Sequence, residues 1–181
     1  MKNCNEVKKV LISAQEIQIK VEDLAKNVTR DYAGKRPLVV GVLKGAWIFL
    51  ADLLRKAELD LDVDFICVSS YGNRTYSSGK VDVLKDLTME CRGRDVLLVE
   101  DIIDSGITLS HIKELLFFHG AKSVEIAALL SKQSRRKVSI DVKYLGFEIP
   151  DEFVVGYGMD YQERFRTLKD ICILSEEVYK R

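Results

Sequence analysis

The feature that most constrains the fold is a set of apolar runs, each long enough for one buried strand, alternating with segments of helical periodicity. LVVGVL (38–43), DVLLVE (95–100) and SVEIAALLS (123–131) are almost continuously apolar, as strands covered on both faces are. GAWIFLADLLRKA (45–57) follows the first run, and ITLSHIKELLFFHG (107–120) follows the second. This alternation predicts an α/β fold, with a mainly parallel twisted sheet flanked by helices.

Weaker patterns complete the predicted elements. Ser13 and Glu16 form a capping box ahead of an amphipathic helix that Gly34 ends. Trp47, within the helix 45–57, is expected to be a core residue. Residues 69–80 have no apolar period and predict a long loop with a function. Further strands are expected at LDVDFICVS (61–69), VDVLKD (81–86), VKYLGFE (142–148), FVVGY (153–157) and ICILS (171–175).

Length and charge limit the classes of function. A chain of 181 residues suits a single domain, so one domain over residues 1–181 is expected. Lys plus Arg and Asp plus Glu both total 28, which gives no bulk charge for binding nucleic acid or a membrane surface. No apolar run reaches the roughly 18 residues that a membrane span needs. Four separated cysteines without a C-x-x-C pair favour a reduced, cytoplasmic location.

The stretch VEDIIDSGITL (99–109) gathers three carboxylates, Glu100, Asp101 and Asp104, at the turn from a buried strand to a helix. Ligands of parallel α/β sheets bind beyond the carboxyl ends of the strands, so a site is expected here. Gly106, the nearby hydroxyls and the first N–H groups of the helix predict a phosphate-binding turn. Carboxylates repel a phosphate unless a sugar diol or Mg²⁺ accompanies it, so a sugar phosphate or a magnesium complex fits this turn.

A structural explanation of the same turn stays open. An Asp or Ser that caps a helix stabilises it by roughly 0.5–2 kcal/mol, which accounts for Asp104 or Ser105 but not for the two earlier carboxylates. The turn has neither the lysine of G-x-x-x-x-G-K-[ST] nor the glycines of G-x-G-x-x-G, so neither common nucleotide motif applies.

The chain resembles a known family at this turn and beyond it. VLLVEDIIDSGITL (96–109) resembles the diphosphoribosyl-binding signature of type I phosphoribosyltransferases, in the form found in hypoxanthine-guanine phosphoribosyltransferases. The resemblance implies the fold of that family, with a small hood formed by the N- and C-terminal segments. It extends over nearly the whole chain through GVLKGA (41–46), SSYGN (69–73), LLSK (129–132) and GFEIPDEFVVGYGMDYQERFR (146–166).

The same resemblance implies purine salvage. Such enzymes convert hypoxanthine, together with guanine, and 5-phosphoribosyl 1-diphosphate into IMP or GMP and diphosphate, with Mg²⁺ as cofactor. Asp104 is then the catalytic residue, a general base or hydrogen-bond acceptor at the purine N7 proton. Glu100 and Asp101 contact the ribose hydroxyls directly or through magnesium, and Asp160 is a further magnesium ligand.

The remaining substrate contacts are also implied by the resemblance. Lys132 donates to the purine O6, which makes adenine, with its amino group, a poor substrate. Taken singly, a lysine in such a place is usually a solvated charge. The other assigned residues are Ser105, Gly106, Ile107 and Thr108 for the 5′-phosphate, Leu43, Lys44, Gly45 and Arg166 for the diphosphate, Phe153 and Val154 for the base, and Ser70 and Tyr71 in a lid.

Two other functions stay open at this point. A regulator on the same scaffold could sense phosphoribosyl diphosphate and bind nucleic acid, but it would be expected to lose Asp104 or Lys132 and to gain a basic face. A phosphoribosyltransferase preferring xanthine or a pyrimidine is the second alternative. Small-molecule substrates are the expected partners, without nucleic acid or membrane, and the resemblance implies a homodimer or homotetramer. The sequence does not rank hypoxanthine, guanine and xanthine.

Overall fold

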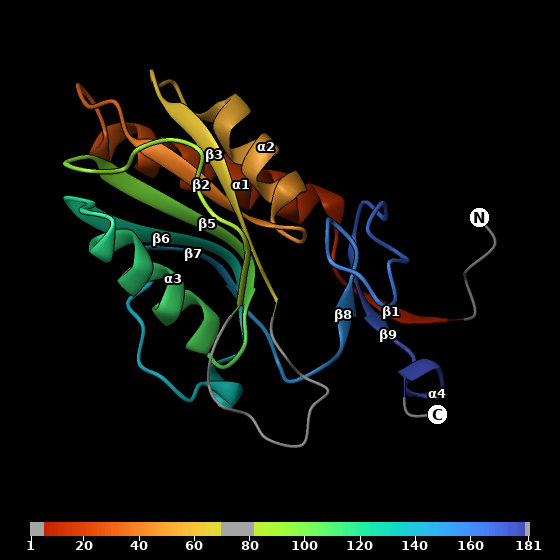
Figure 1. Ribbon diagram of the computed structural model, residues 1–181. Coiled ribbons are helices and arrows are strands. Elements are labelled where there is room, and N and C mark those ends of the chain that lie inside the picture. The colour runs from red at the N-terminus through yellow and green to blue at the C-terminus, as the bar shows by residue number, and fades with distance from the viewer. Residues whose placement is uncertain (1–5, 70–81, 180–181) are drawn as a thin grey trace.

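The computed structural model describes residues 6–69 and 82–179 (Figure 1). In chain order the elements are β1 (Val7–Ile12), α1 (Ala14–Asp31), β2 (Leu38–Leu43), α2 (Trp47–Lys56), β3 (Asp62–Ser69), β4 (Asp82–Lys85), β5 (Asp95–Ile103), α3 (Ile107–Phe118), β6 (Ser123–Ser131), the 3₁₀ turn η1 (Gln133–Arg135), β7 (Tyr144–Glu148), β8 (Val154–Val155), β9 (Ile171–Leu174) and α4 (Glu176–Tyr179).

The main sheet has six strands in the order β4-β3-β2-β5-β6-β7. Every pairing is parallel except that of the edge strand β4, which runs antiparallel to β3. The predicted α/β fold with a mainly parallel sheet is therefore confirmed. Because β2, β5 and β6 are adjacent and parallel, their carboxyl ends meet at one edge, and ligand sites form at such edges.

The strands of this sheet are buried on both faces. Val39, Leu97 and Val99 pack with α1 and α2 in one core cluster, whereas Val40 and Leu98 pack with α3 in the other. Alternate residues of a strand point to opposite faces, so each apolar run supplies both clusters. Figure 1 shows α1 and α2 together on one side of the sheet and α3 on the other.

A second, antiparallel sheet of order β1-β9-β8 forms the hood. It joins the two ends of the chain, since Val7 pairs with Leu174 and Ile12 with Ile171. Figure 1 places this small sheet beside the carboxyl ends of β5 and β6. The expected hood is thus present, although its first strand, β1, was not among the strands predicted from the sequence.

Local predictions mostly agree with the structure. The Ser13–Glu16 capping box is present, and the helix it begins, α1, ends at Asp31. The prediction for Trp47 was wrong: it is 45% exposed at the start of α2 and lies beside Gly158 of the hood rather than over the sheet. Across the described ranges, no helix has the length and apolar character to cross a membrane.

Candidate active site

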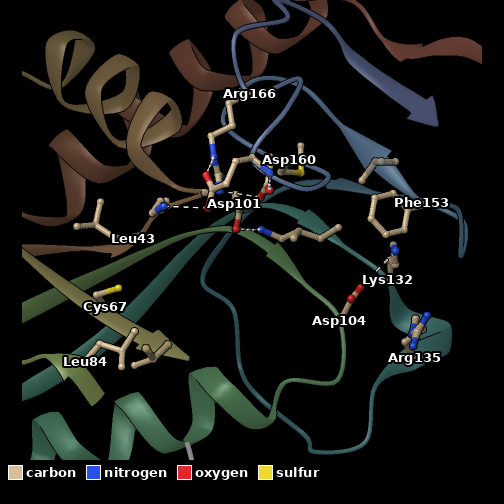
Figure 2. A pocket seen from close by; sticks show the side chains of 17 residues that line it. Leu43, Cys67, Leu84, Asp101, Asp104, Lys132, Arg135, Phe153, Asp160 and Arg166 are labelled. Carbon is tan, nitrogen blue, oxygen red and sulfur yellow. Dashed lines mark hydrogen bonds and ion pairs between the residues drawn. The ribbon is translucent and has the colours of Figure 1, made fainter. Parts of the chain in front are cut away.

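A cavity of about 750 Å³ opens where the main sheet meets the hood (Figure 2). Residues from the ends of β2, β5 and β6 form one wall, and residues of the hood form the other. Most residues assigned from the sequence line it, namely Leu43, Lys44, Gly45, Asp101, Asp104, Lys132, Phe153, Val154, Asp160 and Arg166.

The other assigned residues lie outside that lining. Glu100 is buried in the C-terminal half of β5, one residue before Asp101. Ser105 and Gly106 form the turn after Asp104, and Ile107 and Thr108 are the first residues of α3. Ser70 and Tyr71 fall outside the described residues, so their assignment to a lid stays a prediction. Lining residues not assigned from the sequence include Arg135, Met159 and Glu163.

The end of β2 brings backbone close to the acidic turn. The Leu43–Lys44 peptide is cis. At Gly45 a Cβ atom would lie 1.8 Å from the Asp101 carboxylate, so no other residue fits there without a shift. A Cβ on Gly158 of the hood would lie 2.2 Å from the Gly45 carbonyl oxygen. Glycine at both positions thus lets three chain segments meet at the cavity.

The two carboxylates at the end of β5 are both buried. Glu100 is 8% exposed and Asp101 is 9% exposed, and a Glu100 oxygen accepts from the Asp101 N–H at 3.1 Å. Burial, and then the adjacent Asp101 charge, raise the pKa of the Glu100 carboxyl well above its ordinary value. Burial also raises the pKa of Asp101. A cation or a hydroxyl donor beside this buried pair would stabilise its ionised form.

The acidic pair fits a magnesium ion that keeps substrate and water oxygens in its shell. Mg²⁺ is bound through one or two protein carboxylates more often than by a complete protein cage. Asp101 and Asp160 both line the cavity and can supply such oxygens. In residues 6–69 and 82–179 no group of three or more acidic, His or Cys side chains has the geometry of a metal cage.

The turn before α3 has the features of a phosphate site. The N-cap is Gly106, with φ +81° and no side chain to cover the first N–H groups of the helix. Ser105 Oγ accepts from the Ile107 N–H at 3.3 Å, so capping explains Ser105 in part. Asp104 instead directs its carboxylate to Lys132. Helix capping therefore explains one polar residue of the turn, Ser105. The N-terminus of α3 is left to bind an anion.

Lys132 follows β6 and is 6% exposed. Its Nζ lies 3.5 Å from Asp104 and 3.7 Å from Asp151, and Figure 2 shows it directed toward Asp104. Its backbone N–H donates to the Ile103 carbonyl at 2.9 Å, which ties the end of β6 to the end of β5. An ammonium group and a carboxylate thus face the same part of the cavity from neighbouring strands.

The hood supplies cations that are paired with its own carboxylates. Arg166 contacts Asp160 at 2.8 Å and Glu163 at 3.1 Å, and it donates to the Gly158 carbonyl at 2.9 Å. Lys44, from the sheet side, contacts Glu163 at 2.9 Å. Hydrogen bonds from Lys44 and then Arg166 lower the pKa of the Glu163 carboxyl. Glu163 therefore bridges the two cations that were assigned to the diphosphate.

Phe153 is held by two aromatic neighbours. Its ring stacks on Tyr179 of α4 at 5.0 Å between centroids and meets Tyr161 edge-on at 5.6 Å. The Tyr161 hydroxyl donates to the Val178 carbonyl at 3.2 Å, which links the same cluster to the C-terminal segment. Phe153 lines the cavity together with Met159, so both apolar side chains can contact a flat ligand.

Comparison with known proteins agrees with this geometry. The model of the phosphoribosyl transferase domain matches residues 10–162. The hypoxanthine-guanine phosphoribosyltransferase of Bacillus subtilis is 51% identical, over 97% of this chain and 98% of that protein. The bifunctional protein TilS/HprT of Listeria innocua is 53% identical over 97% of this chain, which spans only 27% of that relative.

Solved structures give the same result. A crystal structure of a hypoxanthine phosphoribosyltransferase from Staphylococcus aureus superposes with a TM-score of 0.93 at 45% identity, over 98% of this chain and 96% of the other. This agreement covers both the main sheet and the hood. The chain therefore belongs to the phosphoribosyltransferase family and, within it, to the hypoxanthine-guanine phosphoribosyltransferases.

Proposed function

We propose that this chain joins a free 6-oxopurine to the ribose carbon of phosphoribosyl diphosphate, releasing diphosphate and forming IMP from hypoxanthine or GMP from guanine. The observation that carries this proposal is the facing pair of Asp104 and Lys132 at 3.5 Å in the cavity. A carboxylate that accepts beside an ammonium that donates matches the N7 proton and the O6 oxygen of a 6-oxopurine.

The chemistry of the base follows from this pair. Asp104 accepts a hydrogen bond or the proton at N7, which makes the purine nitrogen that attacks the ribose carbon more nucleophilic. Lys132 donates to O6, where negative charge develops as the proton leaves. A 6-amino group would instead present donors to an ammonium, so adenine is discriminated against. Phe153 packs against the face of the base, and Val154 contacts it through the backbone.

The phosphoribosyl diphosphate is bound along the strand ends. The 5′-phosphate binds to residues 104–108, which include Ser105, Gly106, Ile107 and Thr108. The ribose hydroxyls bind to Glu100 and Asp101. Leu43, Lys44, Gly45 and Arg166 bind the diphosphate. Glu100, Asp101 and Asp160 would hold Mg²⁺, which would supply positive charge to stabilise the leaving diphosphate. Ser70 and Tyr71 belong to a lid that excludes water from the reacting centre.

We further propose that residues 1–181 act as one domain, that the protein works in the cytoplasm and that it forms a homodimer or homotetramer. The bacterial relatives that match over their full length support the first of these statements. A structural study of the Trypanosoma cruzi enzyme, 35% identical, concerns the role of its C-terminal region in oligomeric state and activity. In this chain the C-terminal Tyr179 contacts Phe153 at the cavity.

The test is nucleotide formation from phosphoribosyl diphosphate and four bases in parallel, namely hypoxanthine, guanine, xanthine and adenine, with and without Mg²⁺. We expect turnover of hypoxanthine and guanine that depends on Mg²⁺, with adenine inert. Lys132→Gln should reduce turnover with both 6-oxopurines. Preferred turnover of xanthine would establish the alternative specificity. Binding of phosphoribosyl diphosphate without turnover of any base would contradict the proposal and favour a sensor on the same fold.

A further inference from the structure

Arg136 has no role in the assignments above, yet its side chain lies against the phosphate turn. It follows η1, and its Nη2 donates to Ser131 Oγ at 2.7 Å, where Ser131 is fully buried at the end of β6. A Cβ on Gly106 would lie 3.2 Å from Arg136 Cδ and 3.3 Å from Arg136 Nη1. The guanidinium therefore turns back from the loop and packs directly behind the N-cap of α3.

The second guanidinium nitrogen is without a partner. Arg136 Nη1 is buried and makes no hydrogen bond to the described residues. Arg135 pairs with Asp151, and Arg166 pairs with Asp160 and Glu163. Within the described ranges no carboxylate forms an ion pair with Arg136. A buried charged donor without a partner costs free energy, so the position of the Arg136 guanidinium beside the turn requires an explanation.

The backbone after Arg136 holds the same turn in place. The N–H groups of Lys137 and Val138 both donate to the Ser105 carbonyl, at 2.9 and 3.2 Å. The segment 136–138 thus contacts the turn through two backbone hydrogen bonds and through the packing of one cationic side chain. A turn held in this way keeps the early N–H groups of α3 in fixed positions before an anion arrives.

The charge of Arg136 bears on how the turn can bind a phosphate. The 5′-phosphate carries close to two negative charges at neutral pH, and it must bind next to Glu100, Asp101 and Asp104. The partial positive charge of a helix N-terminus, about half an elementary charge, does not offset these groups alone. Lys132 is already paired with carboxylates. The guanidinium of Arg136 is a partly buried cation beside the turn, and no described carboxylate neutralises it.

We propose that Arg136 is a positioning residue for the 5′-phosphate, which acts through Gly106 and the turn 104–108 to make that turn bind a phosphate dianion. The inference rests on the proposed function, because that function places the 5′-phosphate at this turn. It adds a cation to a site otherwise described as backbone N–H groups and hydroxyls. It also predicts a specific defect, in which binding of the 5′-phosphate weakens while binding of the purine does not.

The experiment measures binding of ribose 5-phosphate, which has this phosphate but no diphosphate, by titration calorimetry with the full chain in the presence of Mg²⁺. Arg136→Met keeps an unbranched apolar stem and removes the guanidinium with its charge, and Arg136→Lys keeps the charge. Arg136→Gln is a second neutral variant in case the first does not fold. Lys137→Met is the matched control, because the Lys137 side chain is exposed and only its backbone contacts the turn.

We expect affinity for ribose 5-phosphate to fall about tenfold or more in Arg136→Met and Arg136→Gln, as for a lost charge-assisted interaction. Arg136→Lys should retain it within about threefold, and Lys137→Met should match the wild type. The KM for hypoxanthine should stay within about twofold in all of them. Wild-type affinity in the neutral variants would overturn the proposal, and so would equal losses in Arg136→Lys and Arg136→Met.

Failure of the proposed function gives a different result. A wild-type protein that binds ribose 5-phosphate but forms no nucleotide would contradict the enzyme assignment and leave the dependence on Arg136 measurable. An active wild-type enzyme whose affinity for ribose 5-phosphate does not change with residue 136 would contradict the inference alone. Binding calorimetry and nucleotide formation are therefore run on the same preparations.

Discussion

The two walls of the cavity differ in the burial of several of their charges, although the Asp104 side chain on the sheet side is 49% exposed and the Arg166 side chain on the hood side is 18% exposed. On the sheet side Glu100, Asp101 and Lys132 are all less than 10% exposed. On the hood side the Glu163 side chain is 64% exposed, and Lys44, which pairs with it from the end of β2, is 63% exposed. Charges interact more strongly in a buried setting, where fewer water dipoles screen them. The sheet side is therefore suited to the chemical step, and the hood side to binding a charged group that enters and leaves.

The difference also concerns what a ligand must displace. Asp104 and Lys132 already face one another from adjacent strands, so a 6-oxopurine meets donors and acceptors that are in position. Glu163 instead occupies both Lys44 and Arg166, the cations assigned to the diphosphate. Binding of the diphosphate at these cations would exchange these ion pairs for new ones. We therefore expect the hood side to tune affinity and the sheet side to determine rate and base specificity.

Among substitutions at Lys132, Gly45 and Glu163, the largest effect is expected at Lys132, on the sheet side. Lys132→Gln removes a buried charged donor, and hydrogen bonds to charged groups contribute about 1.5–3 kcal/mol, which corresponds to roughly 10- to 150-fold. We expect a fall of that size in kcat/KM for hypoxanthine, with the KM for phosphoribosyl diphosphate nearly unchanged. Steady-state kinetics with each substrate varied in turn checks this. An equal rise in both KM values would remove the distinction between the walls.

A second test disturbs the close contact between Gly45 and Asp101 on the sheet side. Gly45→Ala would place a Cβ within 1.8 Å of the buried Asp101 carboxylate, so either the backbone or Asp101 must move. Overpacking of this kind costs about 1–3 kcal/mol. We expect a lower free energy of unfolding in urea and a higher KM for phosphoribosyl diphosphate. Ala51→Ser, on the exposed face of α2, is the control and should change neither. Wild-type stability in Gly45→Ala would show that the approach is not tight.

The smallest effect is expected on the hood side, at Glu163. Glu163→Gln frees Lys44 and Arg166 from an exposed carboxylate, and exposed ion pairs contribute only about 0.2–1 kcal/mol. We expect the KM for phosphoribosyl diphosphate to fall by roughly two- to fivefold, together with tighter product inhibition by diphosphate. Glu177→Gln, an exposed carboxylate of α4, is the matched control. A higher KM in Glu163→Gln would mean that Glu163 assists binding instead of competing with it.

The sheet side could be predicted from the sequence because its signals are local. The apolar runs give β2, β5 and β6, and the residues after the second run give the acidic turn, whereas Lys132 was assigned only through the resemblance. Burial on both faces makes such runs almost continuously apolar, so their positions and ends are easy to identify. The contact between Lys132 and Asp104 across the strand ends came only from the structure.

The hood could be predicted only in outline. β1 is a short strand whose partner, β9, lies at the other end of the chain, and its sequence VKKVLI has no clear alternation. Glu163 was missed because its contact with Lys44 joins residues 119 positions apart. Gln162, Glu163 and Phe165 also have positive φ values, which no local pattern of non-glycine residues indicates. Trp47 was misplaced because the first turn of α2 lies beside the hood, which long-range pairing creates.

The measurement that tests the central claim most directly compares the kinetics of Asp104→Asn and Arg166→Gln, with hypoxanthine and phosphoribosyl diphosphate varied separately. Loss of a general base lowers the rate by about 10²- to 10⁴-fold. The account predicts such a fall in kcat for Asp104→Asn with the KM for phosphoribosyl diphosphate within a few-fold, and mainly a higher KM for Arg166→Gln. An unchanged kcat in Asp104→Asn, or the same pattern in both variants, would contradict the division of work between the sheet and the hood.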